Sequence, residues 1–288
     1  MSTPTPTASA STLRPASVAR WHDQAPQIAE ATAPTWVARG ANFVVTVTDA
    51  QAGACIARRG QPDEYMVFLP ESGATFRAGG ETLQAGPDSL TIVPPGDSEI
   101  VLQGAGQVVC LYSHLAQDLM AQAGNAADYA EATPDVAPLL PWPTPADGFK
   151  LRSYALAQHT QADSNMRIFR STNLMLNIMT PRMVARDVRK LSPHSHVDFE
   201  QGSLALQGQW VHHMRYPWVP DMTAWREDEH IEVGSPSLTV IPPKVVHTSR
   251  NLNDGGAWLL DIFAPPRLDF ASKPGKVANE KDYPLPAA

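Results

Sequence analysis

The feature that most constrains this chain is a segment that occurs twice. Residues 81–99 and 229–247 align without a gap, and a glutamate, a glycine, a Ser-Leu-Thr run and two adjacent prolines coincide. The other apolar positions match in kind. Self-similarity of this sort indicates one supersecondary unit used twice. We therefore expect two tandem copies of one β unit, the alternative being a chance similarity between two strands that end in Pro-Pro.

The runs around the repeat favour strands rather than helices. Residues 42–48, 64–69, 108–112, 173–179 and 258–263 are rich in β-branched and other apolar residues, and turn-prone residues bound them. The 27 prolines of the 288-residue chain suit many turns and short strands. With 43% hydrophobic residues the chain can bury a sizeable core. The sequence thus predicts an all-β protein.

Between the two copies lies a segment of different composition. Residues 114–132 are rich in Ala, Gln and Leu and predict one or two short helices. Residues 133–145 hold prolines at a density that neither a helix nor a central strand accepts. We therefore predict a linker over 114–147, which divides the chain into two halves.

Histidines gather in the second half. His194 and His196 are two residues apart, so on a strand both side chains would point to one face. Glu200 follows at an even step, and His247 would come from another strand after two prolines. Three imidazoles and one carboxylate suit a divalent transition metal such as Fe, Mn, Ni or Zn, with coordination positions left for water or substrate. The alternative is a histidine-rich strand that packs without a metal.

These residues resemble the two motifs of the cupin superfamily. The first motif, His-x-His followed by Glu and a later Gly, corresponds to His194, His196, Glu200 and Gly208, with the glycine one residue later than usual. The second corresponds to 242–251, where Lys244 replaces the usual turn glycine. Gly234 also lies two residues further upstream of Pro242 than the pattern expects.

The resemblance implies a bicupin: two tandem double-stranded β-helix (jelly-roll) barrels, joined by the short helical and proline-rich linker. The implied metal lies in the mouth of the C-terminal barrel. The expected parts are a disordered N-terminal arm (1–20), a degenerate N-terminal barrel (21–113), the linker (114–147), a metal-binding C-terminal barrel (148–270) and a C-terminal tail over the surface (271–288).

The first copy lacks the imidazoles. His247 aligns with Glu99, and residues 58–65 contain no histidine. We interpret the N-terminal copy as structural support, as part of the assembly or as a wall of the pocket. A rival hypothesis is a carboxylate site for Mg²⁺ or Ca²⁺ made of Asp63, Glu64 and Glu99.

The second copy carries an insertion of 13 residues between Trp210 and Glu229. Its aromatic and cationic side chains are typical of pockets for small anionic or aromatic ligands. The alternative is a long hairpin that packs on the other copy or on a second subunit. The candidate proton-transfer residues are His212, His213 and Tyr216, and the candidate substrate-binding residues are Trp210, Arg215, Trp225 and Arg226. Alternation leaves open which of His212 and His213 faces inward.

Composition excludes several partners. A net charge of −7 argues against a nucleic-acid ligand, which requires a basic face. No apolar run is long enough to cross a membrane, and the N-terminal residues lack the apolar core of a secretory signal, so we expect a cytoplasmic protein. Cys55 and Cys110 cannot form a disulfide framework and are expected as free thiols. Cupin-like chains often pair through exposed sheets, so we expect a homodimer.

The leading functional hypothesis is a metal-dependent cupin enzyme acting on a small organic acid or aromatic compound, with dioxygenase chemistry favoured. Isomerase, decarboxylase and lyase reactions occur on the same ligand set, and the fold does not select between them. The other hypotheses are a non-catalytic module that binds a small molecule and a structural or storage protein whose metal has no open position.

Overall fold

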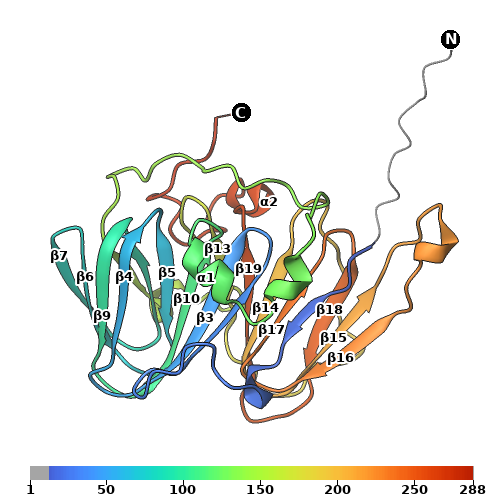
Figure 1. Ribbon diagram of the computed structural model, residues 1–288, viewed down its shortest axis with the longest axis horizontal. Coiled ribbons are helices and arrows are strands. Elements are labelled where there is room, and N and C mark those ends of the chain that lie inside the picture. The colour runs from blue at the N-terminus through green and yellow to red at the C-terminus, as the bar shows by residue number, and fades with distance from the viewer. Residues whose placement is uncertain (1–12, 288) are drawn as a thin grey trace.

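The computed structural model describes residues 13–287, which fold into four antiparallel sheets and a few short helices (Figure 1). One six-stranded sheet has the order β1-β17-β14-β19-β13-β12. Its strands are β1 (Ser17–Ala19), β12 (Ile168–Arg170), β13 (Met175–Ile178), β14 (Gln201–Gln207), β17 (Ser237–Ile241) and β19 (Trp258–Phe263). The second six-stranded sheet has the order β11-β8-β5-β10-β3-β2. Its strands are β2 (Thr35–Arg39), β3 (Phe43–Ala50), β5 (Tyr65–Leu69), β8 (Ser89–Val93), β10 (Gly106–Ser113) and β11 (Arg152–Ala155).

A smaller sheet completes each barrel. The N-terminal barrel, on the blue-green side of Figure 1, adds the sheet β4-β9-β6-β7, and the C-terminal barrel, in yellow to red, adds β16-β15-β18. These strands are β4 (Cys55–Gln61), β6 (Ala74–Ala78), β7 (Glu81–Ala85), β9 (Gly96–Leu102), β15 (Trp210–Arg215), β16 (Glu229–Val233) and β18 (Val246–Asn251). The predicted all-β fold of jelly-roll barrels is confirmed.

Within residues 13–287, helices lie in the connections between strands and in the segment after the last strand. The linker contains α1 (Gln117–Gln122) and η2 (Ala126–Tyr129), and the C-terminal segment contains α2 (Leu268–Ala271). Single 3-10 turns are η1 (Trp21–Asp23), η3 (Leu156–His159) and η4 (Met222–Ala224). Among the described residues no helix has the length and apolar character that crossing a bilayer would need.

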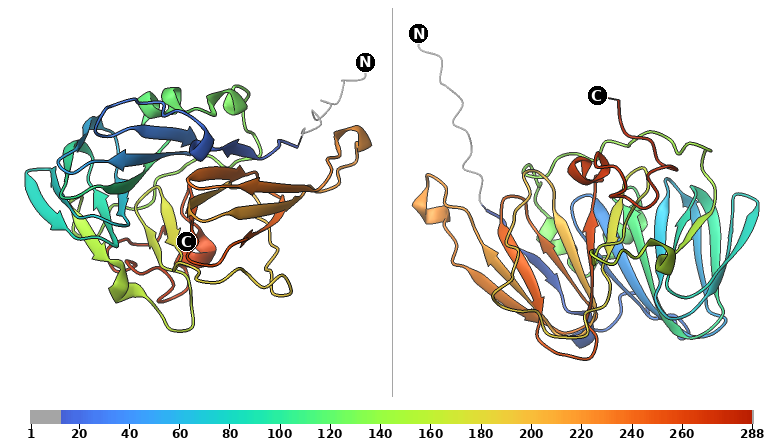
Figure 2. Two further views of the ribbon diagram at one scale, coloured as in Figure 1. Left: turned by 90° about the horizontal axis from the view of Figure 1, so that it is seen from below. Right: turned by 180° about the vertical axis from the view of Figure 1, so that it is seen from behind.

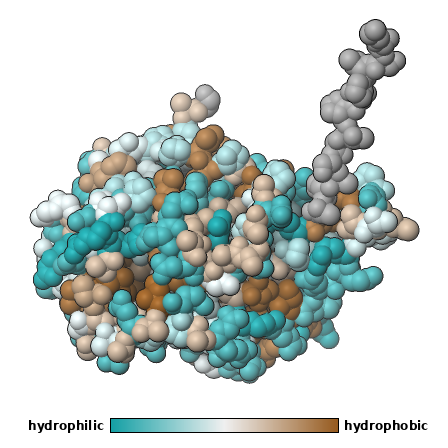
Figure 3. Space-filling model, viewed as in Figure 1, coloured by the Kyte–Doolittle hydropathy of each residue, from teal (hydrophilic) through white to brown (hydrophobic). Residues whose placement is uncertain are grey.

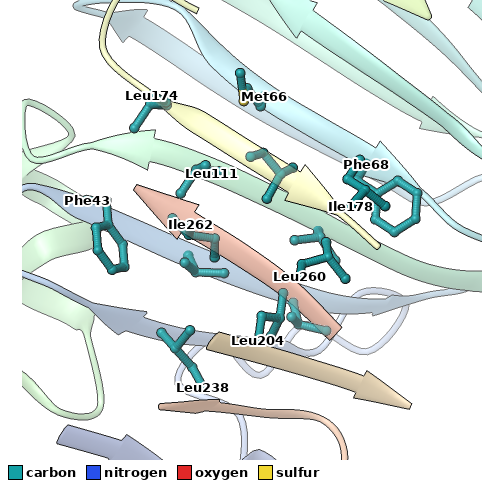
Figure 4. Close-up of a cluster of buried hydrophobic side chains, with 14 of the residues drawn as sticks. Phe43, Met66, Phe68, Leu111, Leu174, Ile178, Leu204, Leu238, Leu260 and Ile262 are labelled. Carbon is teal, nitrogen blue, oxygen red and sulfur yellow. The ribbon is translucent and has the colours of Figure 1, made fainter. Parts of the chain in front are cut away.

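The main hydrophobic core lies between the barrels. Phe43, Met66 and Leu111 of one large sheet pack against Leu204, Leu260 and Ile262 of the other, and all of them are buried (Figure 4). The strands of these sheets therefore bury both faces, one against the other barrel and one inside their own. This explains why they read as continuous apolar runs rather than as an alternating pattern. On the face drawn in Figure 3, hydrophobic residues form separate small areas between hydrophilic ones.

The strand register makes the repeat explicit. Tyr65 faces Val93 in the N-terminal barrel, and Gln201 faces Ile241, the repeat partner of Val93, in the C-terminal barrel. Glu64 is therefore equivalent to Glu200, and Tyr65 to Gln201. By the same register, the apolar interior positions Val67 and Cys110 correspond to the polar Ser203 and Asp261. The two cysteines are free, as expected.

The halves exchange their edge strands. Strand β1, from the N-terminal segment, pairs with β17 of the C-terminal barrel, and β11, which follows the linker, pairs with β8 of the N-terminal barrel. The arm predicted to be disordered over 1–20 is thus ordered where it forms β1, and its first twelve residues lie outside the described range. The left panel of Figure 2 shows the blue segment that contains β1 beside the C-terminal barrel.

The C-terminal tail is also less peripheral than expected. Val277 pairs in parallel with Ile168, and Tyr283 is buried, with its hydroxyl donating to Oε1 of Glu64 over 2.9 Å. The tail therefore packs back onto both barrels rather than running over the surface.

Candidate metal centre

Three histidines converge in the C-terminal barrel, with His196 and His247 buried and His194 exposed. His194 and His196 precede β14, and His247 lies in β18. One ring nitrogen of each lies within 4.8 Å of the others. The backbones of His194 and His247 pair directly, with N···O distances of 3.1 and 2.8 Å. The structure thus brings together the three imidazoles that the sequence singled out.

The tautomers of two imidazoles follow from their partners. Nδ1 of His247 lies 2.9 Å from the carbonyl oxygen of Val245, and Nδ1 of His194 lies 2.9 Å from that of Ser192. A carbonyl only accepts, so each Nδ1 carries a proton, and in the neutral ring Nε2 keeps its lone pair. Burial lowers the pKa of His247 to about 3 and that of His196 to about 4, so both are neutral at neutral pH. These are the protonation states that a metal requires.

Glu200 does not belong to this cluster, which corrects the prediction of a carboxylate ligand. Its carboxylate accepts from Arg14 Nη2 over 2.9 Å, from the Ala41 backbone N–H over 2.7 Å and from the Tyr129 hydroxyl over 3.2 Å. A Cβ on Gly40 would lie only 2.8 Å from Oε2 of Glu200, so glycine there permits the approach. Glu200 instead joins the N-terminal arm, the linker and the N-terminal barrel.

The repeat explains this placement. Glu64, its equivalent, accepts from the Thr172 backbone N–H over 3.2 Å, which lies in the other half of the chain. Each barrel therefore uses one buried glutamate to bind a backbone N–H of the opposite half. Glu200 fulfils the structural role that Glu64 fulfils in the first copy.

Gln201 stands where the carboxylate was expected. Its Oε1 lies 2.8 Å from Nε2 of His196 and 3.2 Å from Nε2 of His247. Residues 191–200 do not form a regular strand, and β14 begins only at Gln201, so the alternation assumed between His196 and Glu200 fails. The sequence did hold a signal for this, because six residues separate Gln201 from Gly208 and a ligand at 201 restores the usual place of the glycine.

Lys244 takes the backbone conformation of the glycine it replaces. Its φ is 67°, a left-handed value that side chains other than glycine seldom adopt. Its backbone N–H donates to the carbonyl oxygen of His196 over 2.6 Å. The strained turn therefore links the segment of His196 to the strand that carries His247.

A cavity of about 440 Å³ opens from the histidine cluster. His194, His247 and Gln201 lie in its wall, together with Asp261, whose pKa burial raises to about 6. The remaining wall is largely apolar, with a few polar groups and three arginines. The wall also includes Asn177, Ser192, Trp210, Ser249, Arg182, Arg186 and Arg267.

Two of these arginines form no ion pair with a carboxylate of the described chain. Arg186 donates instead to the Ser249 carbonyl over 2.7 Å and to Ser192 Oγ over 2.9 Å, which fixes its guanidinium at the wall. Arg182 has no acidic partner within residues 13–287. Arg267, by contrast, is paired with Asp269 at 2.7 Å. Arg182 and Arg186 were not among the sequence candidates because they lie in an irregular segment without a motif.

The candidate residues of the insertion mostly lie outside the cavity. The hairpin from β15 to β16 extends away from the barrels (Figure 1). Arg215 pairs with Asp228, Arg226 pairs with Glu229, and Trp225 stacks on the exposed Trp218. Tyr216 binds the Ala16 backbone N–H and Glu229. These side chains surround a separate hollow on the hairpin, and only Trp210 of the predicted set lines the metal cavity.

The structure settles which of the two adjacent histidines faces inward. His213 points to the outer face, with its Nδ1 2.8 Å from that of His230. His212 is fully buried, and its Nδ1 lies 2.7 Å from Oγ of Ser249, a residue of the cavity wall. His212 is thus one side chain removed from the cavity and does not line it.

Buried His212 predicts an acid sensitivity of the fold. Burial lowers its pKa to about 4, whereas the unfolded chain binds the proton with a pKa near 6.5. As the pH falls from about 6.5 to about 4, the unfolded state binds a proton at His212 that the folded state does not bind. The free energy of unfolding then drops by up to about 1.4 kcal/mol per pH unit from this side chain.

The comparison is between wild type and His212→Asn, unfolded in urea across this pH range. The difference in their free energies of unfolding is expected to shift in favour of the variant as the pH decreases. A constant difference from pH 7 to pH 4 would contradict the assignment of His212 as buried and neutral.

The alternative carboxylate site of the first copy is not formed. Glu64 is occupied by Thr172 and Tyr283, Asp63 accepts from Asn173 over 2.6 Å, and Glu99 pairs with Arg59 near the surface. Across residues 13–287, the histidine trio is the one group of metal-ligating side chains that meets.

Comparison with known proteins agrees with this architecture. No family model matches the sequence, and no curated protein matches it either. A point mutant of Bacillus subtilis oxalate decarboxylase aligns over 89% of this chain and 78% of its own, with a TM-score of 0.59 and 12% identity. The chain has a cupin fold.

Two further solved structures align to similar extents. Oxalate decarboxylase from Lactobacillus farciminis, in a formate complex, has a TM-score of 0.57 and 12% identity and covers 89% of this chain and 90% of its own. Protein Ylba from E. coli aligns over 89% of this chain and 94% of its own, with a TM-score of 0.58 and 11% identity. At such identities the likeness concerns the fold alone.

Proposed function

We propose that this protein is a metal-dependent cupin enzyme whose substrate is a small organic acid bound in the C-terminal barrel. The observation that carries the proposal is the meeting of three imidazoles at a cavity that also holds two arginines without acidic partners among residues 13–287. Most of the remaining wall is apolar, which suits a carboxylate with an apolar body.

The donor set fits a divalent transition ion. His247 directs a lone pair toward the Gln201 oxygen, and ring nitrogens of His194, His196 and His247 lie within 4.8 Å of one another. A cation satisfies such a group of acceptors, and imidazole suits Fe, Mn, Ni or Zn. When bound, the ion would polarise a coordinated oxygen of the substrate.

The residues around the cluster have separate tasks in this proposal. Arg186 and Arg182 would bind the substrate carboxylate and orient it against the ion. Asp261, at the cavity wall, would hold or accept a proton near the reacting group. The apolar wall excludes water around it.

The finer parts of the proposal follow from the resemblance and the repeat. We propose a bicupin in which the N-terminal barrel supports the catalytic one, and a homodimer as its assembly. Dioxygenase chemistry would use O₂ as co-substrate. Decarboxylase chemistry, the activity for which two similar structures are named, would instead release CO₂ from the acid itself.

The test begins with elemental analysis of the purified protein. The metal-loaded protein is then incubated with a panel of small carboxylates, hydroxybenzoates and catechols, while O₂ consumption and CO₂ release are followed. Metal at one equivalent with turnover of a carboxylate supports the proposal. If the reconstituted protein binds no transition metal, the proposed function is wrong.

A substitution at Arg186 tests substrate recognition. Removing a charge-assisted hydrogen bond costs about 1.5–3 kcal/mol, so Arg186→Ala should weaken binding of benzoate to the metal-loaded protein by roughly tenfold or more. Calorimetric titration measures this directly. Arg226→Ala, whose guanidinium pairs with Glu229 on the hairpin, serves as the control and should bind benzoate like wild type. Loss of affinity in Arg226→Ala together with wild-type affinity in Arg186→Ala would place the anion site on the hairpin instead.

A further inference from the structure

We propose that Gln201 is the fourth metal ligand, so that this centre holds its ion with an uncharged donor set of three imidazoles and one amide oxygen. The inference rests on the proposed function, because it names a ligand of the same site. It goes beyond that proposal by assigning the ligand and the charge of the centre.

The orientation of the Gln201 amide is fixed by chemistry. Its Nε2 lies 3.1 Å from Oδ1 of Asp261 and 3.0 Å from Oγ of Ser203. With its nitrogen donating to these two oxygens, the amide turns its oxygen toward the histidines. Asp261 is in turn bound by Asn177 Nδ2 at 3.4 Å. Asp261 thereby acts as a positioning residue for Gln201.

The resulting contact with His247 lacks a donor. Nδ1 of His247 already donates to the Val245 carbonyl, so its Nε2 presents a lone pair to Oε1 of Gln201 at 3.2 Å. Both atoms are buried, and two acceptors at hydrogen-bond distance require a shared cation or proton. A metal ion also bound by His194 and His196 meets that requirement.

The charge of the centre follows from these ligands. A carboxylate at position 201 would cancel one unit of the ion's charge, whereas the amide cancels none. No ligand would then cancel any of the ion's double charge, and the cavity wall around it contains Arg182 and Arg186 as well as Asp261. Such a centre attracts anions more strongly than one with a carboxylate ligand. The proposed ligand set thus favours an anionic substrate.

The first experiment measures Mn²⁺ binding to full-length protein by the EPR signal of the free ion. Gln201→Ala is expected to lower the affinity for Mn²⁺ by at least about tenfold. Glu200→Gln is the matched control at the adjacent position and is expected to keep wild-type affinity. All variants are checked for folding by circular dichroism, and titrations are run well below their unfolding temperatures.

The outcomes separate the two proposals. If wild type binds no Mn²⁺ and no other transition ion, the proposed function fails and the ligand assignment with it. If wild type binds the ion and folded Gln201→Ala binds it equally well, only the assignment of Gln201 is overturned. Loss of affinity in Glu200→Gln but not in Gln201→Ala would restore Glu200 as the ligand.

The second experiment tests the charge. Gln201→Glu should bind Mn²⁺ at least as tightly as wild type, since a carboxylate is a strong ligand for this ion. Formate should bind to its Mn²⁺ complex about tenfold more weakly than to that of wild type, measured by the loss of water-proton relaxation as formate displaces bound water. Equal affinity for formate in both complexes would overturn the role of the neutral donor set.

Discussion

Replacing His247 with alanine is expected to abolish stoichiometric metal binding. His247 is buried, its tautomer is fixed by the Val245 carbonyl, and its Nε2 faces both Gln201 and the other histidines. Loss of an outer partner of a ligand typically lowers metal affinity by 10–100-fold, so removal of the ligand itself should cost more than about 100-fold. Elemental analysis after dialysis against a weak chelator measures the effect.

Glu99 provides the matched control for this substitution, since the repeat aligns it with His247. Its carboxylate pairs with Arg59 at the surface of the N-terminal barrel, so Glu99→Ala should keep one equivalent of metal. His194→Ala should lose metal as His247→Ala does. Equal metal loss in Glu99→Ala would mean that the metal-binding barrel has been assigned wrongly.

Replacing Glu200 with alanine is expected to destabilise the fold strongly. Its buried carboxylate accepts from Arg14, Ala41 and Tyr129, so alanine leaves the Ala41 N–H and the Tyr129 hydroxyl without their acceptor and leaves the partly buried Arg14 paired with Asp135 alone. A hydrogen bond to a charged group contributes about 1.5–3 kcal/mol, and alanine removes three of them. Urea unfolding at neutral pH should therefore give a free energy of unfolding lower by at least about 3 kcal/mol.

Replacement of an exposed carboxylate gives the reference value for the change in free energy of unfolding. Asp97, whose side chain is 67% exposed beside Arg59, should change stability by no more than about 0.5 kcal/mol when replaced by alanine. If Glu200→Ala costs as little as Asp97→Ala, the buried cluster around Glu200 does not stabilise the fold.

Much of the architecture could be predicted from the sequence because the repeat preserves its strand pattern. The Ser-Leu-Thr run and the paired prolines recur at equivalent strands, β8 and β17, and the predicted strand over 258–263 coincides with β19. The exchanged edge strands could not be predicted. Three residues of β1 carry no pattern that distinguishes one barrel from the other, and their position depends on tertiary packing.

The site could be predicted only in part, because some of its residues lie in or beside irregular backbone. The histidines follow a motif with fixed spacing, so their convergence could be expected. The fourth position depended on where β14 begins, and one residue of irregular backbone moved the inward-facing side chain from Glu200 to Gln201. Arg182 and Arg186 reach the cavity through an irregular segment, where no periodicity relates sequence position to direction.

The exchange of β1 and β11 has a consequence for any attempt to divide the protein. A fragment cut within the linker would carry away the edge strand that belongs to its neighbour and leave its own sheet one strand short. Each fragment would expose an unpaired sheet edge together with the apolar surface of the inter-barrel core, which invites self-association. Soluble material should therefore be recovered only when both fragments are produced together and reassemble.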